Sequence, residues 1–388
     1  MQISHLPLRK FVAPEFIIGE HALSKCADYV AVFGAKKVLL VTDPGLVQAG
    51  WVSKVEQHLK EQHIPFERFD AVSPNPRDTE VKDGALLYRR MGCDMIIAIG
   101  GGSPIDCAKG IGIVVSNGGS ILDYEGVDKI ERPIPPLLCI PTTAGTGADI
   151  SQFAIILDSA RKVKIAIISK GIVPDISLID PLCTATMDPE LTAATGMDAL
   201  THAFEAYVSN ASSPVTDMHA LQAIEYLSEY LPGAYQHPLD ISYRSGVMLG
   251  SLFAGLAFSN ASLGIVHAMA HALGGLLDLP HGLCNALILE HSVAYNFSSC
   301  PERYRTIAEK ILKKSLASES DETVRNLLQS YLETLRHKLN LGDKIEIAAV
   351  DEQTLVQLAR VALRDPCVVT NPRTPKEEEI QALYAKIL

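Results

Sequence analysis

The segment from residue 94 to residue 115 constrains the fold more than any other part of the chain. An apolar run, DMIIAIG (94–100), passes into GGGS (100–103) and then into a helical pattern. The run has the length and composition of a strand buried on both faces of a parallel sheet. With Ser103 as the helix cap and Pro104 at the first helical position, free N–H groups would point toward an anion. The turn predicts a pyrophosphate site at Gly101, Gly102 and Ser103, although it lacks the G-x-G-x-x-G spacing and such turns often bind nothing.

Strand and helix patterns alternate around this segment. VLLVTD (38–43) and a run near 65–69 have the composition of strands, and helical patterns cover 52–61 and 78–91. This alternation predicts a doubly wound α/β sheet with right-handed crossovers. We therefore expect residues 1–184 to form an α/β dinucleotide-binding domain with a Rossmann-like parallel sheet.

Polar side chains follow two more strand ends. LLCI (137–140) runs into PTTAGTGAD, and ligands of open α/β sheets bind at the carboxyl ends of the strands. Thr142, Thr143 and Thr146 are therefore expected on the phosphate and ribose side of the crevice. Asp43 ends the first strand, where a carboxylate can accept hydrogen bonds from the adenosine ribose and repel a 2′-phosphate. Capping of the turn TDPG by Asp43 is an equal alternative.

Two alternating segments, FAIILD (153–158) and KVKIAIIS (162–169), precede ISLID (176–180). They predict a hairpin that returns toward the sheet. Lys164 lies in the second segment, where the residues alone indicate a lysine on the surface of a strand.

Helical patterns dominate from Pro189 onward. Breaks are expected near 212–214, 232–240, 280, 301 and 339–343, and the domain boundary near 182–188. We therefore expect residues 185–388 to form an all-α domain.

Histidines cluster in GIVHAMAHALGGLLDLPHG (264–282). His267 and His271 are four residues apart and share a helix face, and His281 follows Pro280. GMDALTHAFEAY (196–207) places Asp198 and His202 at the same spacing on another predicted helix. Carboxylate and imidazole ligands suit Fe²⁺ or Zn²⁺, and also Mn, Co or Ni. The alternative is a set of core histidines that hydrogen-bond to backbone carbonyls.

Glu205 follows His202 by three residues, so it either orients a metal ligand or lies exposed on its helix. His219, His237 and His291 lack partners at ligand spacing, and we expect them to be structural or surface residues.

These motifs, together with IGGGSPIDCAK, PTTAGTG and the final DPCVVTNPR, resemble the iron-containing (group III) alcohol dehydrogenase family, in order and over nearly the whole chain. The resemblance implies one divalent metal, Fe²⁺ or Zn²⁺, bound by Asp198, His202, His267 and His281. It places His271 between metal and nicotinamide, as a proton relay or cofactor contact, and favours NAD over NADP. It assigns Asp106, Lys164 and Leu182 to the cofactor site and Phe153, Phe258 and Cys367 to the substrate pocket. For these last three residues, ordinary core packing is an equal alternative.

The sequence departs from the family at two places. Ala148-Asp149 replaces a Ser-Glu pair, and Glu290 replaces a proline. We assign no role to Asp149, and we expect the loop at Glu290 to differ in shape.

Hydride transfer between NAD(H) and a small aliphatic primary alcohol or aldehyde is the function that these parts imply, with the metal as Lewis acid. One alternative is a zinc-dependent glycerol or polyol dehydrogenase of the same superfamily. Another is a dehydroquinate-synthase-like lyase. Such an enzyme needs several basic residues to bind a phosphorylated acid, and the second half of the sequence has no such cluster. A metal or nucleotide sensor lacks support, because no DNA-binding helix pair or basic stripe is present.

Composition limits the partners. The net charge of −11 argues against nucleic acid or an anionic membrane as the main partner. The start of the chain, MQISHLPLRKFVAPEF, lacks the order of a signal peptide, and we expect no membrane span. Eight cysteines lie scattered without a CxxC pair, as expected for reduced thiols in the cytoplasm. We expect a cytoplasmic homo-oligomer.

Overall fold

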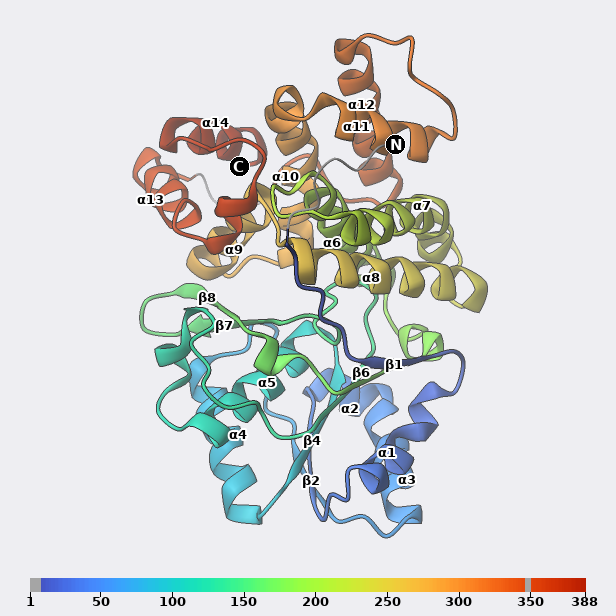
Figure 1. Cartoon of the computed structure of the whole chain (residues 1–388), viewed down its shortest axis with the longest axis vertical. Coiled ribbons are helices and arrows are strands. Elements are labelled where there is room, and N and C mark those ends of the chain that lie inside the picture. Colours follow the sequence, from blue (N-terminus) through green and yellow to red (C-terminus); the bar gives the residue numbers. More distant parts are fainter. Residues whose placement is uncertain (1–7, 346–349) are drawn as a thin grey trace.

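The computed structural model describes residues 8–345 and 350–388, with an α/β half and a helical half (Figure 1). The first residues of the stretch considered for a signal peptide therefore lie outside the described residues. The main sheet is entirely parallel, in the order β1-β9-β6-β4-β2-β3. Its strands are β1 (Glu15–Ile18), β2 (Val38–Val41), β3 (Phe66–Phe69), β4 (Met95–Gly100), β6 (Leu137–Pro141) and β9 (Ile176–Ile179). The expected doubly wound sheet is confirmed, whereas β1 was not predicted.

Side chains alternate between the two faces of this sheet, and each face has its own core. Leu39 and Ile96 pack in the core that contains residues of α4 (Asp78–Met91) and α5 (Gly102–Asn117). Leu40 and Ile97 pack on the opposite side, with residues of α1 (Cys26–Val32) and α3 (Trp51–Glu61). Because both faces are covered, the central strands are apolar throughout, as parallel strands require. A short helix, α2 (Pro44–Ala49), follows β2.

The expected hairpin forms, but its strands belong to a second, smaller sheet. β7 (Phe153–Asp158) and β8 (Val163–Ile168) pair antiparallel, and β5 (Gly126–Val127) pairs with β8 in parallel. The chain then returns to the main sheet as β9. The hairpin lies beside the helical half in Figure 1, because α9 packs on β8.

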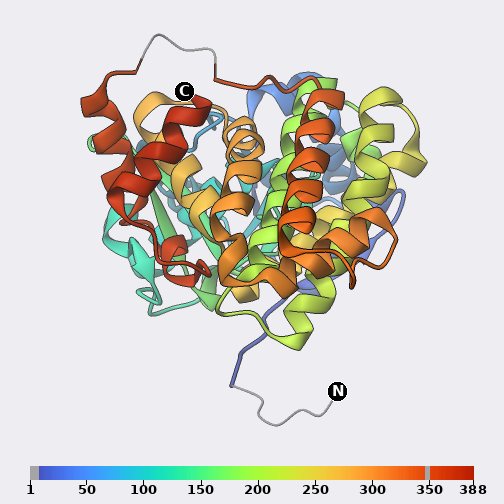
Figure 2. The ribbon, with the colours of Figure 1, turned by 90° about the horizontal axis from the view of Figure 1, so that it is seen from above.

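Only helices and connections follow β9 in the described residues, which confirms the all-α second half (Figure 2). The helices are α6 (Pro189–Val208), α7 (Pro214–Gln236), α8 (Ile241–Ala261), α9 (Ile265–Leu277), α10 (His281–Asn296), α11 (Pro301–Leu312), α12 (Asp321–Lys338), α13 (Glu352–Ala362) and α14 (Glu377–Ile387). The break expected from residue 232 is wrong in its start, since Pro232 lies inside α7. Pro232 lies close to the end of α7, so the backbone hydrogen bond that it cannot make interrupts only the last part of the helix. The packing of α7 along α8 supports the helix at this point.

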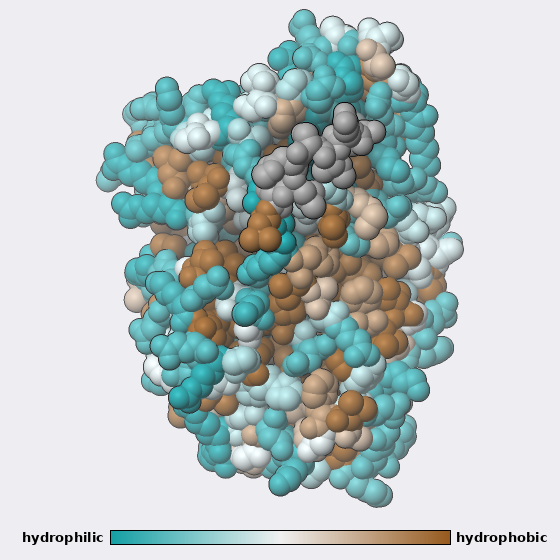
Figure 3. Space-filling view, viewed as in Figure 1, coloured by the Kyte–Doolittle hydropathy of each residue, from teal (hydrophilic) through white to brown (hydrophobic). Residues whose placement is uncertain are grey.

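By length and composition alone, α8 is long and apolar enough to cross a membrane. Two-thirds of its most apolar window is buried inside this chain, against α6 and α7. Apolar side chains also gather on the outer face over α7 and α8 (Figure 3). Val215 and Met218 are exposed there, and Phe11 stacks on His219.

All eight cysteines are free thiols, and all but Cys300 are buried. Their burial is consistent with cysteines that pack as small apolar side chains.

Candidate functional site

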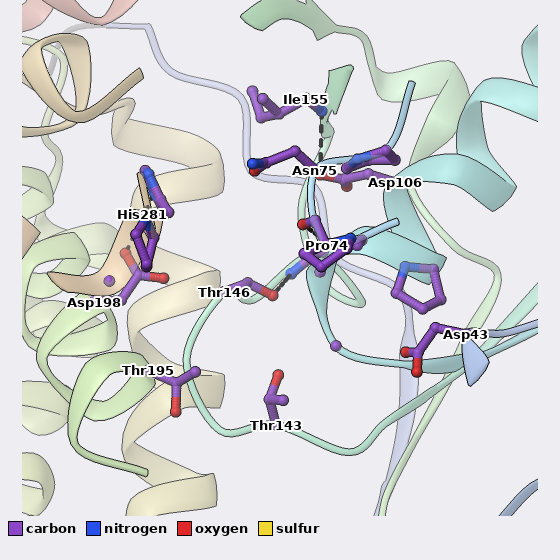
Figure 4. Close-up of a pocket in the computed structure, with 18 of the residues that line it drawn as sticks. Asp43, Pro74, Asn75, Asp106, Thr143, Thr146, Ile155, Thr195, Asp198 and His281 are labelled. Atoms are coloured by element: carbon purple, nitrogen blue, oxygen red, sulfur yellow. Dashed lines mark hydrogen bonds and ion pairs between the residues drawn. The ribbon is translucent and has the colours of Figure 1, made fainter. Parts of the chain in front are cut away.

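A cavity of about 890 Å³ lies between the two halves of the chain. One end is formed by residues that follow the strands β2, β4 and β6, and the other by side chains of α6, α9 and α10. Figure 4 shows Asp198 and His281 on one side of the cavity, Asp43 on the other, and Thr143 and Thr146 between them. The lining includes these predicted site residues: Asp43, Gly101, Gly102, Ser103, Asp106, Thr142, Thr143, Thr146, Phe153, Lys164, Asp198, His202, Phe258, His267, His271 and His281.

Asp198 is the centre of the ligand cluster. Its Oδ1 lies 3.4 Å from Nε2 of His267, 3.6 Å from Nε2 of His281 and 3.9 Å from Nε2 of His202. Asp198, His267 and His281 each offer an atom within 4.8 Å of the other two. The ring of His202 stacks on that of His267, with centroids 4.4 Å apart, so His202 lies at the edge of the cluster.

The donor chemistry fits a divalent transition metal. Asp198 is 2% exposed, and its ion-pair partners among the described residues are histidines, with no lysine or arginine. A buried carboxylate with no lysine or arginine beside it depends on histidines or on a metal ion for a compensating positive charge. One carboxylate and three imidazoles are a ligand set that suits Fe²⁺ and Zn²⁺.

Glu205 holds the imidazole of His267 in one orientation. Its Oε2 lies 2.6 Å from Nδ1 of His267, and its Oε1 accepts a hydrogen bond of 2.7 Å from the backbone N–H of Val266. Glu205 is 5% exposed, so the alternative of an exposed helix carboxylate is wrong. Because Nδ1 faces Glu205, the Nε2 atom faces Asp198, an arrangement typical of metal-binding histidines.

Burial and the carboxylates shift the pKa values of the histidines in opposite directions. Burial lowers the pKa of His202 to about 3 and also lowers that of His281. For His267, burial favours the neutral ring, but the hydrogen bonds to Asp198 and Glu205 outweigh it and raise the pKa to about 9. Burial acts to raise the pKa of Asp198, but the surrounding histidines outweigh burial and lower it.

His271 lies beside the cluster and has a carboxylate partner of its own. Its Nδ1 is 2.8 Å from Oδ2 of Asp365, and its ring stacks on that of His281 with centroids 5.3 Å apart. Sequence reasoning missed Asp365, although it begins the DPCVVTNPR motif. The pairing leaves Nε2 of His271 as the nitrogen available to a ligand.

Asn285 is a second residue that sequence reasoning missed. It is fully buried on α10, and its Nδ2 lies 2.6 Å from Oδ1 of Asp198. The same nitrogen is 3.2 Å from Nε2 of His267 and 3.1 Å from Nε2 of His281. Its spacing of four residues from His281 on one helix was the available signal.

At the cofactor end, helix α5 begins earlier than expected. Gly101, rather than Ser103, is the N-cap residue, and Pro104 lies within the first turn. Ser103 cannot cap the helix because it is already helical, and its hydroxyl donates to the carbonyl of Pro74. Gly101, Gly102 and Ser103 line the cavity, so the start of this helix lies at the end where a pyrophosphate was expected.

Two glycines show how closely the chain packs at this end. A Cβ on Gly102 would lie 3.0 Å from Cγ2 of Thr146, and a Cβ on Gly145 would lie 2.6 Å from the carbonyl oxygen of Thr195. Thr195 lies on α6, three residues before Asp198. The cofactor loop therefore rests directly on the backbone of the helix that carries two candidate metal ligands.

Asp43 both caps a helix and lines the cavity. Its Oδ1 accepts a hydrogen bond of 2.9 Å from the N–H of Leu46 and caps α2, and the residue lines the cavity. Capping and contact with a ribose are therefore compatible in this geometry.

Two lysines and one aspartate support the hairpin side of the cavity. Lys164 lines the cavity, so it is not a surface-strand lysine, and burial lowers its pKa. Asp106 accepts a hydrogen bond of 3.1 Å from the N–H of Ile155, and burial raises its pKa to about 6. Lys109, which sequence reasoning missed, is fully buried and donates to the carbonyls of Ala148, Ser151 and Phe153 at 2.5–2.8 Å.

Both departures from the family pattern lie away from the ligand cluster. Asp149 is buried and accepts a hydrogen bond of 2.6 Å from the hydroxyl of Ser177. Glu290 lies inside α10, so the expectation of a loop at this position is wrong, and its Oε2 is 3.5 Å from Nη2 of Arg336 on α12.

The predicted substrate residues divide into two groups. Phe153 and Phe258 line the cavity, with ring centroids 5.7 Å apart. Cys367 is 1% exposed and does not line the cavity. Leu182, which was assigned to the cofactor site, packs against the core on the sheet face covered by α1 and α3. The structure does not bring these last two to the cavity.

Comparison with known proteins agrees with this arrangement. Residues 13–181 match the family model described as iron-containing alcohol dehydrogenase, and residues 192–388 match that of the C-terminal part of the same family. Alcohol dehydrogenase 4 of Schizosaccharomyces pombe is 40% identical over 98% of this chain and 89% of its own length. The 1,3-propanediol dehydrogenase of Klebsiella pneumoniae is 40% identical over 94% of this chain and 95% of its own.

Solved structures agree as well. A crystal structure of 1,3-propanediol oxidoreductase superposes with a TM-score of 0.94 at 39% identity, covering 98% of this chain and 99% of the other. The chain belongs to the iron-containing alcohol dehydrogenase family.

Proposed function

We propose that this chain catalyses reversible hydride transfer between NAD(H) and a small aliphatic primary alcohol or aldehyde at a divalent metal, Fe²⁺ or Zn²⁺. The observation that carries the proposal is the position of Oδ1 of Asp198. It lies within 3.9 Å of Nε2 of three histidines, in the same cavity as the glycine-rich ends of the strands.

The two ends of the cavity have separate tasks in this proposal. The metal would be held by Asp198, His202, His267 and His281. Glu205 keeps His267 in the tautomer whose Nε2 would face the metal. The N–H groups at Gly102 and Ser103 and the nearby threonine hydroxyls would bind the dinucleotide phosphates. When bound, the metal supplies a Lewis acid for the substrate oxygen, and NAD accepts the hydride.

His271 is the candidate for proton transfer. Its Nδ1 is occupied by Asp365, so Nε2 is free to exchange a proton with the substrate oxygen, directly or through ribose hydroxyls and water. Asp365 holds the ring in this orientation.

The lining favours a small uncharged substrate. Phe153, Phe258 and Leu263 supply apolar surface, and none of the described lining residues from the helical half is a lysine or arginine. A lyase that binds a phosphorylated acid would need a cluster of such cations at the metal end, and the lining cations among the described residues, Arg77 and Lys164, both belong to the α/β half. This distribution does not support the dehydroquinate-synthase-like alternative.

A substrate panel combined with metal analysis tests the proposal. The protein is purified without added metal, its iron and zinc are measured, and NADH formation is followed with ethanol, butanol, propanediols and glycerol, and NADH oxidation with lactaldehyde. We expect about one metal per chain and turnover of a primary alcohol that stops when a chelator removes the metal. Turnover that persists without metal would refute the proposal. Preference for glycerol with bound zinc would instead favour the polyol dehydrogenase alternative.

We also propose that residues 1–184 and 185–388 are the cofactor and metal domains, and that the protein is a cytoplasmic homo-oligomer. The apolar surface over α7 and α8 supports self-association (Figure 3). Light scattering coupled to size-exclusion chromatography measures the mass, and a single-chain mass would refute the oligomer.

A further inference from the structure

The side chain of Asn285 lies among the atoms that the proposed metal needs. Its Nδ2 is 2.6 Å from Oδ1 of Asp198, 3.1 Å from Nε2 of His281 and 3.2 Å from Nε2 of His267. These are the three residues whose ligand atoms converge within 4.8 Å. We propose that the Asn285 carboxamide competes with the metal for these three residues, so that it stabilises the metal-free protein and lowers the metal affinity.

The hydrogen-bonding capacity of the carboxamide supports this competition. A side-chain NH₂ group has two hydrogens, yet three ligand atoms surround this nitrogen. The other end of the group is unsatisfied, because Oδ1 of Asn285 is buried and has no hydrogen-bond partner among the described residues. The contacts to the three residues therefore hold the nitrogen in place, whereas no described residue holds the oxygen.

A dication and an N–H donor cannot use the same lone pairs at once. Metal ligation requires the lone pairs of Oδ1 of Asp198 and of the imidazole Nε2 atoms to point at the ion. Each imidazole Nε2 has a single lone pair, so the NH₂ group of Asn285 must turn away from His267 and His281 when the metal binds. Its charge-assisted hydrogen bond to Oδ1 of Asp198 can use the second lone pair of that oxygen, but the positive charge of the metal weakens it.

This inference rests on the proposed function, because it takes Asp198, His267 and His281 as metal ligands. It gives Asn285 a role distinct from theirs. A ligand or a residue that orients a ligand would raise the metal affinity, whereas a competitor lowers it.

The test compares the wild type with Asn285→Ala, each prepared metal-free by chelation and then loaded with Zn²⁺. Zinc affinity is measured by competition with a chromophoric chelator, and thermal unfolding is recorded for both forms. We expect Asn285→Ala to bind Zn²⁺ about tenfold more tightly, which is the effect of losing one competing hydrogen bond. The Tm of the metal-free form should fall by roughly 2–4 °C, with a smaller change in the loaded form.

Asn296→Ala is the matched control on the same helix. Asn296 is also buried, and its Nδ2 donates to Oδ1 of Asn371 at 3.0 Å, away from the ligands. Its removal should lower the Tm of both forms equally and leave zinc affinity unchanged. If Asn285→Ala does not fold, Asn285→Ser keeps a polar group too short to reach all three residues and should show the same tighter binding.

Weaker zinc binding by the Asn285 variants, or an equal loss of stability in both forms, would overturn the inference while the metal site stands. A wild-type chain that binds no Zn²⁺ would overturn the metal site and the inference together.

Discussion

The two ends of the cavity are built in different ways. The cofactor end consists of backbone turns and small side chains at the ends of strands, with Gly101 and Gly102 at the start of α5. The metal end consists of long polar side chains that α6, α9 and α10 bring together. A backbone site tolerates a change of side chain as long as the new one is small, whereas a ligand site depends on each group in it.

The two ends also differ in charge. Asp198 and Glu205 are buried carboxylates at the metal end, and they set the protonation of His267. The cofactor end offers N–H groups and hydroxyls, with Asp43 at its edge. Substitutions at one end should therefore change metal binding, and substitutions at the other should change NAD binding.

The largest effect is expected for His267→Ala. Loss of this ligand should remove the metal and lower kcat/KM by a factor on the order of 10³, because several kcal/mol of charge stabilisation is lost. Metal content and NADH formation are measured together. His237→Ala, at an exposed position, serves as the control and should match the wild type. Full metal content in His267→Ala would show that the ligand set is wrong.

The pH dependence of metal binding should come next in size. The pKa of His267 rises to about 9 in the chain without metal, so the metal must displace a proton below that pH. Apparent zinc affinity should therefore rise about tenfold per pH unit from pH 6.5 toward 9. In the metal-free protein the same proton contributes stability that is complete below pH 6.5 and is lost as the pH passes 9. A flat affinity profile over this range would contradict the assignment.

Glu205→Gln tests the carboxylate behind the ligand. Loss of its charge should lower zinc affinity by about 10–100-fold and flatten the pH profile, because the raised pKa of His267 depends partly on Glu205. Glu225→Gln removes a surface carboxylate paired with Lys310 and should change neither property. If the zinc affinity of Glu205→Gln equals that of the wild type, the charge of Glu205 does not contribute to metal binding.

A smaller and separate effect is expected at the cofactor end. Gly102→Ala places a Cβ 3.0 Å from Thr146 and beside the expected phosphates. The KM for NAD should rise roughly tenfold, the equivalent of one lost hydrogen bond, while bound metal stays at the wild-type level. Gly342→Ala is the control, since a Cβ there meets only an ordinary contact. Loss of metal from Gly102→Ala would mean that the two ends are not separable.

Asp43→Asn should have the smallest effect and separates the two roles of Asp43. Asparagine caps a helix about as well as aspartate, so the Tm should stay the same. The negative charge is lost, so the preference for NAD over NADP should weaken by a few-fold up to about tenfold. Comparison of kcat/KM for the two cofactors measures this. An unchanged preference, with an unchanged Tm, would leave Asp43 as a cap only.

The helical spacing of polar residues allowed much of the metal end to be predicted. Asp198 and His202 share a helix face, and His267 lies on the expected helix. His281 was expected in a turn after Pro280, but it is the first residue of α10. Sequence spacing cannot show which side chains from distant segments meet. Asp365 reaches His271 across 94 positions, and the burial of Glu205 depends on the packing of α9 over α6.

The fold was predictable where a pattern is local and strong. The central strands and the helical half followed from apolar runs and periodicity, whereas β1 is short and is paired only with β9, far along the chain. Ser103 has the chemistry of a cap, but the helix begins before it because three glycines permit the earlier turn. Pro232 is an ordinary signal for a helix break, which packing against α8 overrides.

The contact between Gly145 and Thr195 has a consequence for how such enzymes diversify. Since the Gly145 loop touches α6 at Thr195, the spacing between this loop and the helix that carries Asp198 and His202 is fixed by the packing of the main chain. Exchange of Phe153 and Phe258 for other side chains would therefore reshape the cavity wall without changing that spacing.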